Sequence, residues 1–294
     1  MGKTIDQGFS EFLRDLQPLT SEHNKVTAHR SSVHGCLTSN FDCSAFIETG
    51  SFGNGTGIRH YSDTDYFAVI PAGQLKTNSA ISLREVKEAL IKRFPNTMGL
   101  AVKTPAVSIP FGYWASETME VTPACFAGFK EYDSKKFKNY EIADGEGGWM
   151  YSSPEAHNYY VQQVDNALGG KVKPLVRLMK AWKYYNNVPI SSFFLELYTT
   201  RYCAKEPAVV YSIDLQNLFN NLLRNELPGM NDPVGISGRI KPCSSDARHE
   251  DALSKVKTAA GRADRAGAAL ANSKVQEAFE IYDYLFGQNF PGFL

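Results

Sequence analysis

The 294-residue sequence lacks long apolar runs. Its first residues have none of the apolar core of a signal peptide, and no stretch approaches the roughly 18 apolar residues of a membrane-spanning helix. The 5 cysteines are scattered, without a C-x-x-C pair or a His/Cys cluster, so reduced thiols are expected. We therefore expect a cytoplasmic protein with no membrane partner.

The sequence also has no excess of charge of either sign. Lys plus Arg number 31, and so do Asp plus Glu. Proteins that grip nucleic acid through its phosphates usually carry a basic surface, so no DNA binding is expected. A hydrophobic content of 43% with 21% charged residues is typical of a soluble globular protein. The length is enough for one large domain or two ordinary ones.

What the sequence does have is a dense set of reactive groups in the segment GSFGNGTGIRHYSDTD, residues 50–65. Asp63 and Asp65 lie two residues apart at the start of an apolar run typical of a strand, so both carboxylates should project from one face. Gly50 and Ser51 open a glycine-rich turn, where backbone N–H groups and a hydroxyl can approach an anion. Mg²⁺ prefers oxygen ligands and is often shared between carboxylates and substrate phosphates. A solvated strand end or an ordinary loop would explain either feature alone, but their tandem order favours a phosphate and metal site.

A third acid, Glu120, is the only charged residue in the apolar segment MEVTPA, residues 119–124. It is expected on a neighbouring strand, where its carboxylate could ligate the same metal. A surface-facing strand position would explain this residue by itself. Beside the Asp pair, we interpret it as the third ligand.

The periodicity of the chain predicts an α+β fold. Short strands and helices alternate up to about residue 127, and residues 128–153 are predicted to form a loop between two lobes. Apolar residues at 9, 12, 13 and 16 predict a first helix, and a second is expected from an N-cap at Thr20 to Leu37. From residue 154 onward helices dominate, with a Pro/Gly-rich loop at 226–250. We therefore predict a mixed-sheet catalytic core at residues 1–150, an α-helical lobe at 151–294 and an active site in the cleft between them.

These motifs resemble the core of the DNA polymerase β-like nucleotidyltransferase superfamily, in the order G-S, then S-D-x-D-Y-F, then hydrophobic-acid-hydrophobic-x-Pro-Ala. Within it the chain most resembles the bacterial cGAS/DncV-like nucleotidyltransferases (CD-NTases). The segments 175–182 and PISSFFLEL, and the ending LFG…FP, are similar to later signatures of that family. The third acid of the family is commonly Asp, where this chain has Glu120. The zinc-binding insertion of animal cyclic GMP-AMP synthase has no counterpart here.

The resemblance implies roles for three residues of the second half. Lys180 and Ser192 would contact the triphosphate of a bound nucleotide, and Phe193 would lie against a base. Lys180 follows Lys173 and Arg177 on one helical face, so a solvated face is the alternative for it. Core packing is the alternative for Phe193.

The function implied by the resemblance is two-metal nucleotidyl transfer with Mg²⁺, or alternatively Mn²⁺, as cofactor. NTPs, ATP among them, would be joined into a cyclic di- or trinucleotide second messenger, which a downstream effector recognises in bacterial anti-phage (CBASS-type) signalling. The alternative in the same chemistry is a linear oligonucleotide synthase or RNA-tailing enzyme, which would need a basic groove. A catalytically weak nucleotide-binding protein is the third reading. A monomer is expected.

Overall fold

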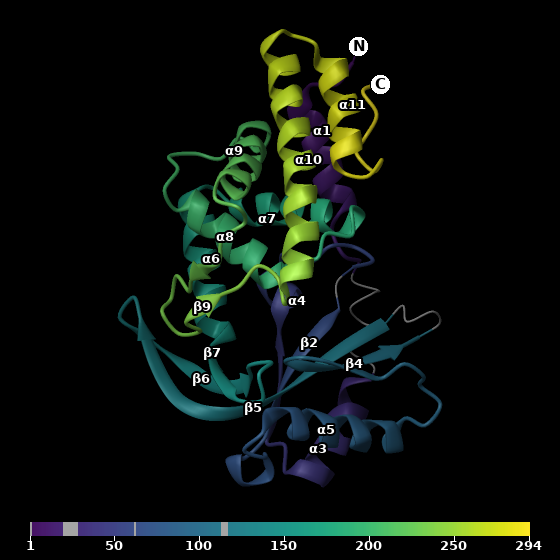
Figure 1. The fold of residues 1–294 in the computed structure, drawn as a ribbon, viewed down its shortest axis with the longest axis vertical. Coiled ribbons are helices and arrows are strands. Elements are labelled where there is room, and N and C mark those ends of the chain that lie inside the picture. The colour runs from purple at the N-terminus through teal and green to yellow at the C-terminus, as the bar shows by residue number, and fades with distance from the viewer. Residues whose placement is uncertain (1, 20–28, 62, 113–116) are drawn as a thin grey trace. The chain divides into compact units, whose positions relative to one another are not determined.

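The structure is a computed structural model that describes residues 2–19, 29–61, 63–112 and 117–294. Its internal contacts divide the chain into two compact units. The sheet unit comprises Pro18–Tyr159 and Val234–Gly238. The helical unit comprises Met1–Gln17, Tyr160–Pro233 and Arg239–Leu294. Both are drawn in Figure 1.

The sheet unit is built on a mixed sheet with the strand order β1-β2-β5-β4-β3. These strands are β1 (Ala45–Thr49), β2 (Thr64–Val69), β5 (Glu117–Tyr132), β4 (Ala106–Phe111) and β3 (Ala101–Lys103). Strands β2 and β5 run parallel, and the other neighbours are antiparallel. The far half of β5 pairs with β6 (Lys135–Ala143), which pairs with β7 (Trp149–Ser152). A short helix, α4 (Gly50–Asn54), follows β1, and a 3₁₀ turn, η1 (Ala72–Gln74), follows β2.

Two helices cover one face of this sheet, α3 (Arg30–Phe41) and α5 (Ser79–Arg93) (Figure 1). Helix α5 begins at the N-cap Asn78, whose side chain accepts a hydrogen bond from the N–H of Ala80 at 3.0 Å. Apolar side chains of both helices form one core with Tyr66 and Val121 of the sheet. Because side chains alternate along a strand, Asp65 and Glu120, the residues just before these two, project from the opposite face.

The helical unit contains α1 (Ile5–Asp15), α7 (Val172–Tyr185), α8 (Ser192–Cys203), α9 (Tyr211–Arg224), α10 (Asp246–Ala271) and α11 (Val275–Leu285). Helix α6 (Pro154–Ala167) carries the chain from one unit into the other, and β8 (Met230–Asn231) pairs with β9 (Arg239–Ile240). Helix α1 is fixed by a capping box in which Thr4 and Gln7 exchange side-chain to backbone hydrogen bonds. Its buried face packs Phe9 and Phe12 against Phe290 near the C-terminus.

The predicted α+β class is confirmed, and so is the apolar face of the first helix. That helix contacts α7, α9 and α11, so the first 17 residues belong with the helical unit rather than with residues 18–150 as predicted. The second unit also begins later than predicted, at Tyr160 within α6. The expected N-cap at Thr20 lies outside the described residues, and α3 is described from Arg30.

The prediction of a loop at residues 128–153 is wrong. Strand β5 continues to Tyr132 and is followed by β6 and β7, which extend the sheet. Tyr140 and Ile142 of β6 are buried in a small second core with Phe67 and Ala124. The glycines that suggested a loop are confined to the turn between β6 and β7, where Gly145 and Gly147 have positive φ. The loop predicted at 226–250 likewise contains the β8–β9 pair.

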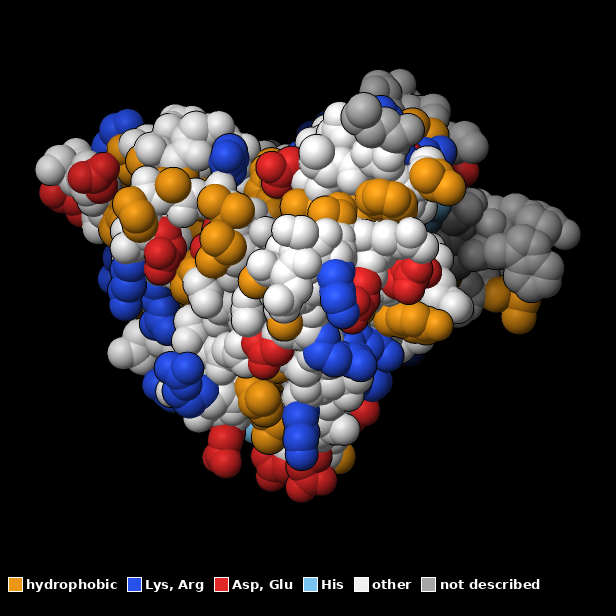
Figure 2. Space-filling model, turned by 90° about the horizontal axis from the view of Figure 1, so that it is seen from above, with side chains coloured by type: hydrophobic (Ala, Val, Ile, Leu, Met, Phe, Trp, Pro, Cys, Tyr) orange, Lys and Arg blue, Asp and Glu red, His pale blue; other side chains and the backbone are white. Residues whose placement is uncertain are grey.

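Among the described residues, no helix combines the length and hydropathy needed to cross a bilayer. On the face shown in Figure 2, Lys and Arg side chains lie among Asp and Glu side chains and uncharged surface. This mixture is what the balanced composition predicts.

Candidate active site

Strand register brings two of the three predicted acids together. Asp65 of β2 is the direct partner of Glu120 of β5 in the parallel pair, and Thr49 of β1 is its partner on the other side. Neighbouring strands lie about 4.8 Å apart, and partners in register project from the same face. The two residues, 55 positions apart in the chain, are therefore neighbours on the face that α3 and α5 leave uncovered.

The missing side chain of Gly50 leaves the space that the carboxylate of Asp65 occupies. Gly50 begins α4 directly after β1 and has a φ of +67°, a conformation that favours glycine. A Cβ added at this position would overlap the carboxylate of Asp65. The glycine of the predicted G-S turn thus allows the aspartate to lie against the backbone of the turn.

Ser51 and Asp63 lie between Gly50 and Asp65 in the chain. Ser51 is the second residue of α4, and its carbonyl accepts the N–H of Thr56 at 2.9 Å, which closes the turn after the helix. Asp63 directly precedes β2, and its side chain is partly exposed. The shared direction of Asp63 and Asp65 therefore stays a prediction, since strand alternation begins only at Thr64.

The carboxylate of Glu120 has a partner on the same face of the sheet, two strands away on β3. Nζ of Lys103, the last residue of β3, donates to Oε1 of Glu120 at 3.3 Å. Strand β3 lies on the opposite side of β5 from β2, so this contact is made on the side of β5 away from Asp65. Within the described residues, no group of three or more His, Cys, Asp or Glu side chains is gathered closely enough to hold a metal ion. The backbone thus pairs Asp65 with Glu120, and a metal site shared by Asp63, Asp65 and Glu120 stays a prediction.

Tyr66 shows how sharply the two faces differ. It lies between Asp65 and Phe67 on β2, is fully buried and stacks on Phe46 with ring centroids 4.4 Å apart. Burial, followed by the charge of Glu48, raises the pKa of Tyr66 to about 12. Its phenol therefore stays neutral and belongs to the core rather than to the chemistry of the site.

In the helical unit, Lys180 is buried rather than solvated. Only 2% of the residue is exposed, and its Nζ lies 2.5 Å from Oε2 of Glu196 on α8. The alternative of a solvated helix face is therefore wrong for this residue. The role implied by the resemblance, contact with a triphosphate, would require the ion pair to open or to be shared, because a buried charge must keep a partner.

Ser192, by contrast, faces a different lysine. Its Oγ accepts a hydrogen bond from Nζ of Lys183 at 2.7 Å and lies 3.0 Å from the hydroxyl of Tyr184. Ser192 is the first residue of α8, after the N-cap Ser191. Phe193, the next residue, is 40% exposed, so full core packing does not account for it. The ammonium group of Lys183 and the hydroxyls of Ser192 and Tyr184 thus meet at the start of α8, where the next residue in the chain is the exposed Phe193.

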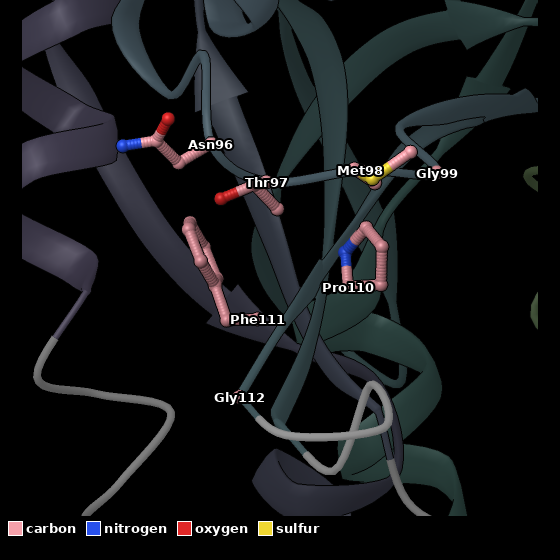
Figure 3. A pocket seen from close by; sticks show the side chains of 7 residues that line it. All are labelled: Asn96, Thr97, Met98, Gly99, Pro110, Phe111 and Gly112. Carbon is pink, nitrogen blue, oxygen red and sulfur yellow. The ribbon is translucent and has the colours of Figure 1, made fainter.

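A separate pocket of about 640 Å³ lies in the sheet unit, at the end of β4. Figure 3 shows Met98 and Pro110 beside each other on one side and Asn96 and Thr97 on the other. None of the side chains that line it is acidic or basic, so it offers neither a carboxylate for a divalent cation nor a cation for a phosphate. They are Asn96, Thr97, Met98, Gly99, Pro110, Phe111 and Gly112.

Sequence reasoning missed Lys103 and Lys183. Lys183 follows Lys180 by three positions, so helical spacing could have marked it as a neighbour on the same side of α7. Lys103 had no such signal. Its contact with Glu120 depends on β4 pairing with both β3 and β5, which no local spacing reveals.

Comparison with known proteins gives one family match. The family model of the Second Messenger Oligonucleotide or Dinucleotide Synthetase (SMODS) domain matches residues 3–165. A probable cyclic nucleotide synthase of Bacillus cereus (strain VD146) is 25% identical over 159 residues, which are 52% of this chain and 46% of that protein. The chain thus spans about half the length of this relative.

Solved structures that are similar over almost the whole chain include two nucleotide complexes. DncV cyclic AMP-GMP synthase of Vibrio cholerae, in complex with the linear intermediate pppA(3′,5′)pG, has a TM-score of 0.73 at 15% identity, covering 99% of this chain and 97% of that one. E. coli MS115-1 CdnC with ATP has a TM-score of 0.71 at 19% identity, covering 97% and 98%. At these identities the likeness shows the fold.

Proposed function

Because the chain belongs to the second messenger oligonucleotide or dinucleotide synthetase family, we propose that it joins NTPs into a cyclic di- or trinucleotide and releases pyrophosphate. The observation that carries the proposal is the in-register pairing of Asp65 with Glu120, with Gly50 packed on Asp65. In each step a ribose hydroxyl attacks the α-phosphorus of a nucleotide, and the bond to pyrophosphate breaks. Such transfers depend chiefly on positioning and on charge stabilisation.

The donor set suits Mg²⁺, or alternatively Mn²⁺. Carboxylate oxygens are the hard ligands that such cations prefer, and Gly50 leaves room beside the carboxylate of Asp65. We assign Asp63, Asp65 and Glu120 as the residues that would hold the metal. When bound, divalent cations would ease deprotonation of the attacking hydroxyl and neutralise charge on the leaving pyrophosphate.

The chain's own groups would position the nucleotide. Gly50 and Ser51 would hold the phosphates from the sheet unit through backbone N–H groups and a hydroxyl. In the helical unit, Ser192 would donate to the triphosphate and Lys180 would counter its charge. Support for this comes from the start of α8, where Ser192 already holds the charged Nζ of Lys183. Phe193 would stack on a base, an interaction worth about 1 to 3 kcal/mol.

The cellular role follows from the product class. The Bacillus cereus relative is described as a probable cyclic nucleotide synthase, and DncV as a cyclic AMP-GMP synthase. We propose that the product is a second messenger made in the cytoplasm, which a separate effector recognises in anti-phage (CBASS-type) signalling.

The test is product analysis with purified protein. All four NTPs are supplied together with Mg²⁺ or Mn²⁺, and products are identified by mass spectrometry before and after phosphatase treatment. A cyclic product has no terminal phosphate and resists phosphatase, whereas a linear product loses its 5′ phosphates. A linear product alone would refute cyclisation, and the absence of any NTP conversion would refute the enzyme.

Variants locate the chemistry. Asp65→Asn and Glu120→Gln should each abolish product formation with an unchanged circular dichroism spectrum, because they remove charge from the paired carboxylates. Glu88→Gln on α5 is the matched control, since its exposed carboxylate lies on the helix that covers the opposite face. Full activity of Asp65→Asn would contradict the metal assignment.

A further inference from the structure

The contact between Lys103 and Glu120 is placed where it can control the third acid. Nζ of Lys103 lies 3.3 Å from Oε1 of Glu120, and the two side chains are 57% and 22% exposed, respectively. Lys103 is the last residue of the edge strand β3. An exposed lysine on an edge strand often serves only to discourage aggregation, but this one is engaged with a proposed metal ligand.

Strand register explains how Lys103 reaches Glu120. Glu120 pairs with Ser108 on β4, and Ser108 pairs with Ala101 on β3. Lys103 lies two residues beyond Ala101, so alternation puts it on the same face as Ala101, Ser108 and Glu120. Strands β3 and β5 are about 10 Å apart across β4, a gap that two long side chains can span and two short ones cannot. An Asp in place of Glu120 would have one methylene fewer with which to lean toward β3.

The direction in which the side chain of Glu120 points affects whether its carboxylate can bind a metal. Asp65 lies on β2, on one side of β5, and Lys103 lies on the other side. A carboxylate that contacts Lys103 reaches toward β3, on the side of β5 away from β2. The cation of Lys103 also reduces the repulsion between the like charges of Asp65 and Glu120, which lie on one face of the sheet.

We propose that Lys103 is a positioning residue for Glu120 and competes with the divalent cation for its carboxylate. This inference rests on the proposed function. In the metal-free protein Lys103 holds Glu120 toward β3. When a cation binds, Glu120 turns toward Asp65, and the exposed lysine side chain moves into solvent. Lys103 thereby sets the concentration of divalent cation that the site requires.

The test is Mn²⁺ binding to the nucleotide-free protein, measured by the loss of the free-ion signal in electron paramagnetic resonance. Lys103→Met removes the charge and keeps a long side chain. Exposed ion pairs are worth about 0.2 to 1 kcal/mol, so its half-saturating Mn²⁺ concentration should fall by up to about fivefold. Lys103→Arg should behave as the wild type. Lys92→Met is the matched control, because Lys92 is an exposed lysine in the last turn of α5.

A second measurement ties the effect to the acid. In a Glu120→Gln background, Lys103→Met should no longer change Mn²⁺ binding, because the carboxylate that it released is gone. In the active enzyme, the Mg²⁺ concentration for half-maximal turnover should fall in Lys103→Met by the same factor as Mn²⁺ binding. Thermal melting verifies that each variant is folded, and Lys103→Gln serves as a second charge-removing variant.

The possible outcomes distinguish failure of the role of Lys103 from failure of the proposed function. If the wild type binds Mn²⁺ and makes product, but Lys103→Met matches Lys92→Met, the lysine is only a charged edge residue and the inference is wrong. A lower affinity in Lys103→Met would also overturn it. If the wild type neither binds Mn²⁺ nor converts NTPs, the proposed function fails and takes this inference with it.

Discussion

Replacement of Gly50 by alanine tests the geometry of the site most directly. Two costs are expected. Gly50 has a φ of +67°, and an alanine in this left-handed region costs about 1 to 2 kcal/mol. The new Cβ would also overlap the carboxylate of Asp65, which must then move aside. Only the second cost concerns chemistry.

Gly238→Ala separates these two costs. Gly238 has a φ of +68° in the same unit, and a Cβ there meets nothing within 4 Å. Both variants should therefore lose similar stability, a few degrees in Tm for a chain of this size. A shift of about 1 Å in a catalytic group can cost roughly 100-fold in rate. We accordingly expect Gly50→Ala to lose about 100-fold or more in turnover, and Gly238→Ala to lose little.

The assay is pyrophosphate release at saturating NTP and Mg²⁺, alongside thermal melts of both variants. Equal melting temperatures with a large difference in rate would support the placement of Asp65 against Gly50. If Gly50→Ala turns over within about threefold of Gly238→Ala, the carboxylate of Asp65 does not need that position. The role assigned to the G-S turn would then be wrong.

Three other predictions concern the helical unit. Lys180→Met should lower the free energy of unfolding by about 3 to 5 kcal/mol, because it removes the cation against which the carboxylate of Glu196 is buried, and it should also raise the KM for NTP. Lys183→Met, at a partly buried position, should raise the KM with a smaller loss of stability. Denaturant titrations and kinetics measure both effects, and an unchanged KM in Lys180→Met would contradict its contact with the triphosphate. Thr4→Ala should destabilise the unit by about 1 kcal/mol, because it removes one of the two side-chain hydrogen bonds of the capping box. Chemical denaturation measures this loss, and no change would mean that Gln7 alone caps α1. Burial, followed by the charges of Asp214 and Glu206, raises the pKa of the Cys203 thiol to about 12. Iodoacetamide at pH 8 should therefore leave Cys203 unmodified in the folded protein and label it in denaturant. Labelling of Cys203 in the native protein would contradict its burial.

Local sequence patterns predicted much of the fold and part of the candidate site. The spacing of Phe9 and Phe12 gave the first helix, and the strand from Thr64 to Val69 follows the Asp pair as expected. The pairing of Asp65 with Glu120 agrees with the expectation that the third acid lies on a neighbouring strand. Residues 128–153 were misread as a loop because glycines and charged residues are frequent there, whereas these residues form strands that are exposed on much of their surface.

The amino-acid sequence by itself determined the chemical groups of this protein, since residue types and short spacings follow from covalent connection alone. It placed Gly50, Ser51 and the two aspartates within the single segment 50–65. Tertiary structure alone decided which charges meet. Lys103 reaches Glu120 through the pairing of three strands, and Lys180 becomes a buried partner of Glu196 through the packing of α7 on α8. Such contacts depend on register and burial, which are set by the whole chain and not by the neighbours of any one residue.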